Sequence, residues 1–496
     1  MPLPAHKTKI ICTIGPASDS PAMIGNMIAA GMNIARLNFS HGEFAKHARV
    51  IATLREQAGR AGRRIAIMAD LPGPKMRIGT LAREPVKLVR GSSFILTTEE
   101  IEGNEKRATV SLKSLPQAVR PGNIIFLADG LIQLRVEQVQ GHEIFCRVEV
   151  GGELRSKKGV NIPGIDLGIS VFTRRDRECL RFALEQGVDA VSQSFVSRGE
   201  DMLEVRQAAR DMGHDPFLIA KIERANARDN IDSILAQADG IMVARGDLGV
   251  EIPIEEIAVA QKFITRKANL VGKPVITATQ MLVSMTRNRR PTRAEATDVA
   301  NAILDGTDGV MLSEESAMGD YPLESVQMLV RIAAATEPHR PPGHFGRVRR
   351  ALRIRPRESM VDALTRSVEE LTRKLENVAA VLAPTTSGYT ARSLSRFRLP
   401  VWILAVSASE KTCRDLLFSH GVWPVLEPEH PDDWTAFAHA YVQRFSLSGT
   451  HVLQTEGPSP LHPQANHRLE IITLNRSVPA GCKDAPADDP LPEKRS

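Results

Sequence analysis

Residues 189–222, DAVSQSFVSRGEDMLEVRQAARDMGHDPFLIAKI, hold two short apolar runs on either side of one amphipathic segment. The runs at 189–195 and 217–222 are short and rich in apolar and β-forming residues, which is typical of strands in a parallel sheet. Between them, residues 200–212 carry helical patterning. Strand, helix and strand in this order indicate a parallel βαβ unit whose helix packs outside the sheet.

The same unit recurs along the chain. Six further apolar runs are predicted strands, at 9–14, 33–37, 65–70, 240–244, 274–279 and 309–312. Helical patterning fills most of the intervals between them, as at 21–30 and 176–186. Eight strands that alternate with helices over about 250 residues predict an α/β fold of the (β/α)8 TIM-barrel type.

One interval, between residues 70 and 189, breaks this rhythm. Short alternating strands separated by turns are predicted there, at 86–88, 93–96, 123–126, 131–138 and 143–150. We therefore expect residues 72–165 to form an inserted all-β domain. Because it follows the carboxyl end of a barrel strand, where active sites lie, this domain is expected to act as a lid.

The remaining boundaries follow from composition and patterning. Residues 1–71 and 166–339 are the two predicted parts of the barrel, and residues 340–358 are an Arg/Pro-rich connector. Alternating strands and helices predict a C-terminal α/β domain at 359–475. The Pro/Asp-rich residues 476–496 are expected to be disordered.

Composition excludes several classes of protein. The 496 residues include 64 basic and 58 acidic side chains, a net charge of +6. Residues 337–357 alone hold seven arginines and one glutamate, so the surplus sits in the connector and does not predict nucleic-acid binding. Five scattered cysteines without a C-x-x-C pair indicate a reducing compartment. No stretch approaches the ~20 apolar residues of a membrane helix, so we expect a cytoplasmic protein with no membrane partner.

Catalytic groups of a barrel sit where its strands end. Six of the eight predicted strand ends carry ionisable or hydroxyl side chains, namely Arg36 with Ser40 and His41, Asp70 with Lys75 and Arg77, Lys221 with Glu223, Asp247, Thr279, and Ser313 with Glu315. Such convergence is hard to attribute to solvated loops alone.

Lys221 and Glu223 are two apart on one strand, so their side chains point the same way. Ions on the inward face of a strand must be paired or bind a ligand. One alternative is a buried salt bridge. The other, which Asp247 on the adjacent strand end favours, is a Mg2+ site formed by Glu223 and Asp247.

Three further side chains indicate the class of substrate. Arg36 and Arg77 offer forked donors that suit phosphate or carboxylate, so a phosphorylated, acidic substrate is expected above the metal. The Thr279 hydroxyl can donate or relay a proton. Its alternative role, a hydrogen bond to neighbouring backbone, fits the local sequence equally well.

Longer motifs add a family resemblance. The chain resembles the pyruvate kinases, in order and spacing, at GMNIARLNFSHG (31–42), SKKGVNIPG (156–164), AKIE (220–223), MVARGDLGVE (242–251), TATQML (277–282) and RPTRAEATDVANAILDGTDGVMLSEESAMGDYP (290–322). The resemblance implies transfer of a phosphoryl group from phosphoenolpyruvate to ADP, which gives pyruvate and ATP. It also implies the same barrel, β lid and C-terminal domain, an allosteric enzyme and a homotetramer.

The resemblance also implies residue roles. Lys221 stabilises the phosphoryl group in flight, Arg36 and Arg77 contact phosphate, and Glu223 and Asp247 hold Mg2+. Gly246, Asp247 and Thr279 hold the substrate carboxylate, and Thr279 belongs to the proton route. Ser313 and Glu315 complete the substrate site. The nucleotide site is lined by Asn38, Phe39, Ser40, His41, Arg77 and, from the lid, Lys158.

Two departures from the family pattern are informative. Many members bind K+ through residues that match Asn38, Ser40, Asp70 and the Leu71 carbonyl, and they carry Thr at the position of Leu71 and Glu at that of Lys75. A lysine supplies a fixed positive charge and repels the cation, so we predict a K+-independent enzyme with Lys75 as an internal cation. The alternative is a solvent-facing lysine. In the second departure, Glu314 replaces a family glycine and Met318 replaces a lysine. Glu314 is strained if that position needs a positive φ.

The C-terminal domain offers an effector loop. Residues 385–392, TTSGYTAR, join a predicted strand to a helix, and Thr385, Thr386, Ser387, Gly388 and Thr390 can cradle a phosphate. In the family the corresponding loop binds a phosphorylated sugar. A plain capped turn fits equally well. Because residues 456–472 differ from the usual second effector loop, we expect an effector other than fructose 1,6-bisphosphate, such as another phosphosugar or AMP.

Two rival functions remain open from the sequence. One is another barrel enzyme that acts on phosphoenolpyruvate or pyruvate, such as an aldolase or lyase, which would not need the lid, Lys158 or the nucleotide segment. The other is a nucleic-acid-binding or regulatory protein built on an inactive kinase. The intact Lys221, Glu223, Asp247 and Thr279 argue against that second reading.

Overall fold

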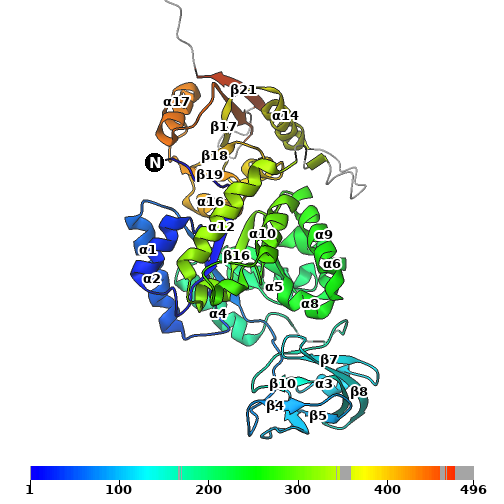
Figure 1. Ribbon diagram of the computed structural model, residues 1–496. Coiled ribbons are helices and arrows are strands. Elements are labelled where there is room, and N and C mark those ends of the chain that lie inside the picture. Colours follow the sequence, from blue (N-terminus) through cyan, green and yellow to red (C-terminus); the bar gives the residue numbers. More distant parts are fainter. Residues whose placement is uncertain are drawn as a thin grey trace, which may run out of the picture.

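A computed structural model describes residues 2–165, 168, 170–341, 343, 345–346, 359–458, 464 and 466–474. The predicted tail at 476–496, most of the predicted connector and part of the 456–472 segment lie outside these residues. The chain is arranged in three parts along one axis, with the barrel in the middle, a β domain at one end and an α/β domain at the other (Figure 1).

Eight parallel strands close the barrel in the order β1-β16-β15-β14-β13-β12-β3-β2. They are β1(Lys9–Thr13), β2(Ile34–Asn38), β3(Ala66–Leu71), β12(Ala190–Gln193), β13(Phe217–Ile222), β14(Gly240–Ala244), β15(Val275–Ala278) and β16(Gly309–Leu312). Each predicted run contains one of these strands or differs from it by a single residue, so the expected barrel is confirmed. Neighbouring strands pair in parallel around the ring, from Lys9 with Gly309 to Ile34 with Ala66.

Helices surround the barrel because its strands are apolar on both faces. They are α1(Pro21–Ala30), α2(Phe44–Arg60), α4(Arg174–Glu185), α5(Gly199–Asp211), α6(Ala225–Asp229), α7(Ile231–Gln237), α9(Ile257–Leu270), α10(Arg293–Asp305) and α12(Pro322–Thr336). Short helices and 3-10 turns follow the strand ends, at α8(Arg245–Glu251), η1(Ile254–Glu256), η2(Val283–Thr286), α11(Glu314–Ala317) and η3(Glu337–His339). Local sequence sets several helix starts. Thr292 and Glu295, for example, form a reciprocal capping box at the start of α10.

The inward side chains of the barrel are mostly apolar, and the C-terminal domain closes one of its ends. Leu417 and Phe418 of that domain join the interior cluster of Ile11, Met68 and their neighbours. The ring of Phe418 stacks on Phe217 at the start of β13, with centroids 4.9 Å apart. Apolar contacts with Leu417 and Phe418 therefore close the amino end of the barrel, and polar side chains lie at its carboxyl end.

The inserted domain leaves the barrel at the carboxyl end of β3. A six-stranded sheet has the order β11-β7-β8-β9-β5-β6, and a two-stranded sheet pairs β10 with β4. The elements are β4(Val86–Leu88), β5(Ser93–Thr97), β6(Arg107–Thr109), α3(Leu115–Ala118), β7(Ile124–Leu127), β8(Ile132–Gln140), β9(Glu143–Val150), β10(Gly152–Leu154) and β11(Val160–Asn161). The short elements β6, α3, β10 and β11 were not predicted, because two to four residues are too few to show a periodicity.

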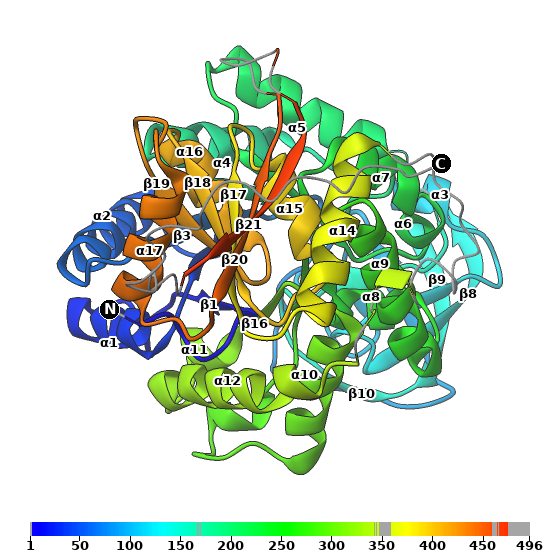
Figure 2. The same ribbon diagram turned by 90° about the horizontal axis from the view of Figure 1, so that it is seen from above.

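The C-terminal domain is a five-stranded sheet with helices on both faces (Figure 2). Its elements are α14(Met360–Lys374), β17(Val378–Pro384), α15(Tyr389–Ser395), β18(Trp402–Ser407), α16(Glu410–Asp415), η4(Leu416–Phe418), β19(Val422–Leu426), α17(Trp434–Phe445), β20(His451–Glu456) and β21(Arg468–Thr473). Along β17, Val381 packs with α14 and α15, whereas Leu382 packs with α17. In the part of the chain that is described, no helix has both the length and the apolar character to cross a membrane.

Candidate active site

A buried network of charges lies at the carboxyl ends of β3 and β13. The Lys221 ammonium is 2.9 Å from Glu223 Oε1 and 3.3 Å from Asp70 Oδ1, and it donates a hydrogen bond to Ser194 Oγ at 2.7 Å. Burial alone would lower the pKa of Lys221, but the carboxylates of Asp70 and Glu223 raise it. The lysine is therefore held as a cation at the base of the barrel mouth.

Asp70 lies at the centre of this network and contacts Arg36, Lys221 and Ser192. Its Oδ2 pairs with the Arg36 guanidinium, whose Nε lies 2.9 Å away, and its Oδ1 accepts from Ser192 Oγ at 2.7 Å. Burial acts to raise the pKa of Asp70, yet Lys221 and Arg36 lower it below its ordinary value. Arg36 also donates to Thr13 Oγ1 at 2.9 Å. Two cations thus converge on one carboxylate, which fixes the position of both.

Glu223 and Asp247, the predicted metal ligands, face the same space. Burial raises the pKa of Glu223, Lys221 opposes this, and the negative charge of Asp247 adds to it. The second oxygen of Glu223 accepts from the Phe195 amide at 2.7 Å. In the described residues no group of three or more acidic, His or Cys side chains gathers at one point. Two carboxylates are the set that suits Mg2+, which fills its other positions with water and substrate oxygens.

Lys75 forms an ion pair with Asp247, with Nζ 3.8 Å from Oδ1. The two side chains are about one third exposed, at 31% and 27%. The Leu71 carbonyl, part of the predicted monovalent-cation pocket, accepts from Ser194 Oγ at 2.7 Å. The structure thus places Lys75 beside Asp247, one of the two predicted metal ligands, while Asp70 of that pocket already pairs with Arg36 and Lys221.

Thr279 lies on a strained turn after β15. Its φ is 68° and that of Gln280 is 51°, the left-handed region that a β-branched residue rarely adopts. The Thr279 hydroxyl accepts from the Gly246 amide at 2.8 Å and donates to the Ala278 carbonyl at 2.6 Å. The alternative role that the sequence left open, a hydroxyl bonded to neighbouring backbone, is therefore the one seen in this structure.

Arg245 holds this turn in place. Its guanidinium donates to the Thr279 carbonyl at 2.7 Å and pairs with Asp298 at 2.5 Å. The Arg245 side chain is only 9% exposed. A strained backbone persists only where its surroundings determine it, and Arg245 supplies that constraint.

Ser313 and Glu315 follow the last barrel strand, where Glu315 binds two backbone amides. The buried Glu315 carboxylate accepts from the Ser313 amide at 2.7 Å and from the Leu282 amide at 3.0 Å. Glu314 begins α11 and is not among the residues with positive φ, so the strain considered for this position is absent. Met318 is exposed.

The predicted nucleotide segment lies beside three cations. The pKa of His41 is lowered by partial burial and then by the charges of Arg77, Lys75 and Arg36. Asn38 Oδ1 accepts from the Ser40 amide at 3.1 Å, which folds the segment back on itself. Phe39 differs from its neighbours because its ring is buried, with the His47 ring 4.6 Å away. The buried Phe39 ring therefore anchors the segment to the barrel and to His47.

The lid reaches the same mouth through Arg77 and Lys158. Arg77 donates to the Lys157 carbonyl at 2.9 Å, and the Lys158 carbonyl accepts from the Ile78 amide at 2.9 Å. The Lys158 side chain is exposed. Arg77 is thereby anchored to the lid segment that carries Lys158.

The predicted effector loop follows β17. Gly388 has a φ of 78°, and a side chain there would collide with the Arg392 guanidinium. Arg392 donates to the Ser387 carbonyl at 2.8 Å, and the Thr386 carbonyl accepts from Thr412 Oγ1 at 2.8 Å. Thr386 and Ser387 are exposed.

Sequence reasoning missed Ser192, Ser194 and Arg245. The first two lie on or just after β12, a strand that was not among the six predicted to end in ionisable or hydroxyl side chains. The rule that catalytic groups follow barrel strands would have identified them. Arg245 stands next to Gly246 but gave no signal of its own, since its partners come from β15 and α10.

Comparisons with known proteins agree with this architecture. A family model described as "Pyruvate kinase, barrel domain" matches residues 5–326, and one described as "Pyruvate kinase, alpha/beta domain" matches residues 362–461. A pyruvate kinase of Thermococcus litoralis is 51% identical over 431 residues, which cover 87% of this chain and 90% of the relative. One of Geobacillus stearothermophilus is 46% identical over 434 residues, 86% of this chain and 72% of the relative.

A solved structure has the same fold over almost the whole chain. The crystal structure of a pyruvate kinase from Cryptosporidium parvum superimposes with a TM-score of 0.87 at 34% sequence identity. The superposition covers 95% of this chain and 97% of the other.

Proposed function

The chain belongs to the pyruvate kinase family, and on this premise we propose how its own residues perform the reaction. It is a phosphotransferase that moves the phosphoryl group of phosphoenolpyruvate to ADP and releases pyruvate and ATP. The observation that carries the residue assignment is the buried Lys221, held as a cation between Asp70 and Glu223 at the carboxyl end of the barrel.

Lys221 and Arg36 stabilise the phosphoryl group during transfer. In the transition state the phosphoryl group is only loosely bonded to the oxygen that it leaves and to the oxygen that it joins. Catalysis therefore depends on positioning and charge neutralisation. Because Asp70 holds both cations by ion pairs, their charges are in place before substrate binds. Arg77 adds a third cation from the lid side.

Glu223 and Asp247 hold Mg2+. Support comes from the mutual repulsion of these two carboxylates, which a shared cation relieves. Bound there, the ion supplies charge neutralisation at the substrate oxygens. The amide of Gly246 and the Thr279 hydroxyl lie next to Asp247, where they receive the substrate carboxylate.

Thr279 belongs to the proton route that turns enolpyruvate into pyruvate, in which its hydroxyl relays a proton from solvent to the methylene carbon. Its hydroxyl accepts from the Gly246 amide at 2.8 Å and donates to the Ala278 carbonyl at 2.6 Å, so the bond to Ala278 must open for the hydroxyl to donate to substrate. Ser313 and Glu315 support the same side of the site, since Glu315 holds the Leu282 amide three residues after Thr279.

ADP binds between residues 38–41 and the lid. The segment presents Asn38, Ser40 and His41 near Arg77 and Lys75, and Lys158 extends from the lid. These cations suit a diphosphate. Phe39 contributes by packing rather than by contact with the nucleotide.

The enzyme works without K+, and Lys75 takes the place of the monovalent cation. Its ammonium is 3.8 Å from Asp247 and contributes to the positive potential at His41. A second cation in the same space would be repelled. The pocket residues Asn38, Ser40, Asp70 and the Leu71 carbonyl then serve as structural acceptors.

Regulation and assembly follow the family. The exposed loop that holds Thr385, Thr386, Ser387, Gly388 and Thr390 binds a phosphosugar or AMP, and the enzyme is a homotetramer. Ile254 and Val259, 74% and 68% exposed, offer apolar surface for assembly. The described cysteines are free and buried, which suits a cytoplasmic location.

A coupled assay for pyruvate formation tests the proposal. We expect turnover of phosphoenolpyruvate and ADP that disappears with EDTA, returns with Mg2+, and is unchanged when K+ is replaced by tetramethylammonium. Sigmoidal kinetics that become hyperbolic with a phosphosugar or AMP would support the effector loop. No pyruvate under any condition would contradict the residue roles, and negligible activity without K+ would contradict the role of Lys75.

A further inference from the structure

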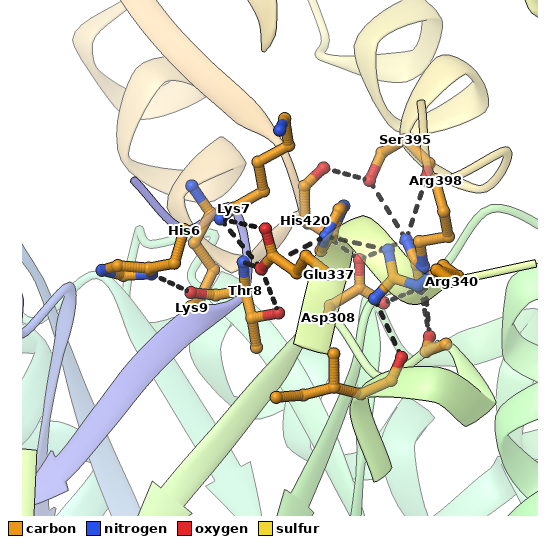
Figure 3. A network of polar contacts seen from close by, with 12 residues as sticks. His6, Lys7, Thr8, Lys9, Asp308, Glu337, Arg340, Ser395, Arg398 and His420 are labelled. Carbon is orange, nitrogen blue, oxygen red and sulfur yellow. Dashed lines mark hydrogen bonds and ion pairs between the residues drawn. The ribbon is translucent and has the colours of Figure 1, made fainter. Parts of the chain in front are cut away.

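A cavity of about 440 Å3 lies at the opposite end of the barrel from the active site. It is enclosed by the first residues of the chain, by η3 at the end of the barrel, and by the C-terminal domain. Its charged lining residues are Lys7, Glu337, Arg340, Glu369, Arg373 and Arg398. Figure 3 shows how several of them converge on His420 at this junction.

The two most buried carboxylates at the junction are already engaged. Glu337 accepts from the amides of Lys7 and Thr8, at 2.9 and 2.6 Å, and from the Thr8 hydroxyl at 2.7 Å. Asp308 forms a bidentate pair with Arg398, at 2.9 and 2.7 Å. Glu337 is thus satisfied by neutral donors, and Asp308 is occupied by one arginine.

Arg340 forms hydrogen bonds with neutral acceptors, and among the described residues no carboxylate forms a close ion pair with it. Its guanidinium donates to His420 Nε2 at 3.1 Å and to the Ile303 carbonyl at 2.8 Å, both of which are neutral acceptors. Within the described part of the chain, its buried Nε has no hydrogen-bond partner and no carboxylate pairs with it. Burial and the charge of Arg398 lower the pKa of Arg340 to about 10.

Glu337 and Asp308 offset part of the effect of burial on Arg340, and the other titratable neighbours are cationic or neutral. Burial and Arg340 lower the pKa of Lys7, although Glu337 opposes this. His420 stays neutral, since burial and four surrounding cations hold its pKa well below the ordinary value. Arg373 is exposed at the rim, and its guanidinium lies close to Gly343. Cations therefore outnumber carboxylates around the cavity.

We propose that this cavity binds a small metabolite through a phosphate or carboxylate group, held between Arg340, Lys7 and Arg373. A buried cation is costly unless it is paired, and an oxyanion pairs with it. The forked donors of arginine suit both groups. The volume is within the range of small-molecule sites, and Phe397, Leu399 and Pro338 offer apolar walls to the carbon skeleton.

The site joins two domains, which predicts the consequence of binding. Lys7 belongs to the barrel part of the chain and Arg340 directly follows it, whereas Arg373 lies on α14 of the C-terminal domain. A shared anion would tie these segments together and stabilise the folded enzyme. The inference rests on neither the phosphoryl site nor the loop at 385–390.

Trp402 provides a local signal. The ammonium groups of Lys7 and Lys9 lie 5.9 and 5.7 Å from the centre of its ring, so an anion that draws Lys7 toward it should change the tryptophan emission. Inorganic phosphate and malonate are titrated separately at constant ionic strength, against chloride. Saturation by phosphate alone indicates a phosphorylated ligand, and saturation by malonate indicates a carboxylate.

Variants locate the signal. We expect a saturable change in the wild type, in Lys221→Met, which alters the phosphoryl site, and in Arg83→Ala, an exposed arginine of the lid. Arg340→Gln and Arg373→Ala should each weaken binding about tenfold or more, the loss typical of one charge-assisted hydrogen bond. Trp402→Phe should remove the signal.

Two outcomes would overturn the proposal. One is the absence of a saturable change with either anion in the wild type. The other is an unchanged dissociation constant in Arg373→Ala, which is exposed and so folds whether or not Arg340→Gln does. Pyruvate formation by the wild type is measured separately, so failure of this site is distinguishable from failure of the active-site assignment.

Discussion

The ammonium of Lys221, near the end of β13, and the carboxylate of Glu223, directly after it, lie 2.9 Å apart and are buried at the carboxyl end of the barrel. Asp70, 3.3 Å from the same ammonium, adds a second negative charge. A buried ion pair is weak evidence for stability, because desolvation offsets most of its attraction. Its retention at the barrel mouth is better explained by a role in holding a cation ready for substrate.

Replacing Lys221 should therefore affect activity and stability together. Lys221→Met removes the charge that faces the phosphoryl group, and we expect kcat to fall on the order of 10²–10³-fold. It also leaves Glu223 without its cation, at a cost of about 3–5 kcal/mol in the free energy of unfolding. The coupled assay and urea unfolding measure the two effects. Lys262→Met, which breaks a pair with Asp305 on the surface, is the control and should change neither by much.

Reversing the charge of Lys75 should create a requirement for K+. Lys75→Glu removes a cation near Asp247 and adds a negative charge, so K+ should then raise activity roughly tenfold or more. Activity is compared in K+ and in tetramethylammonium at equal ionic strength. Lys87→Glu in the lid, an exposed lysine, should behave like the wild type. If the activity of Lys75→Glu is the same with and without K+, Lys75 does not act as an internal cation.

Arg245 is expected to act on Thr279 through the backbone. Arg245→Met loses the hydrogen bond to the Thr279 carbonyl, which lets the strained turn relax and displaces the hydroxyl. A displacement of about 1 Å can lower kcat on the order of 10²-fold. Thr279→Ser keeps the hydroxyl and should retain most of the turnover, whereas Thr279→Val should not. Normal turnover in Arg245→Met would show that the turn holds its shape without the clamp.

Stability of the junction with the C-terminal domain should depend on pH through His420. Its pKa is well below 6.5 in the folded state, so between pH 7 and pH 5 the unfolded chain gains a proton that the folded chain does not. Stability is therefore fully present above pH 6.5 and is lost as the pH falls. His420→Gln keeps an acceptor for Arg340 but does not titrate, and its thermal midpoint should fall less over this range. An identical slope in both proteins would exclude His420 as the source.

Much of this organisation could be predicted from the sequence. The apolar runs are local, and all eight became barrel strands because burial on both faces leaves few other uses for them. The period of two along β13 placed Lys221 and Glu223 on one face, and the strand-end rule located Asp247 and Thr279. The backbone strain considered for Glu314 does not arise, because the short helix α11 accommodates this residue without a positive φ.

Which side chains contact one another could be decided only from the tertiary structure. That Asp70 pairs with Arg36 and Lys221, that Lys75 faces Asp247, and that Phe418 plugs the barrel all depend on how strands far apart in sequence close into a ring. The sequence likewise placed Arg340 in a basic connector, whereas the fold buries its Nε beneath the C-terminal domain with no hydrogen-bond partner among the described residues. Residue type and spacing determine which groups can carry charge. Only the packing of distant segments decides which charges are paired, because the interaction depends on separation and burial in space.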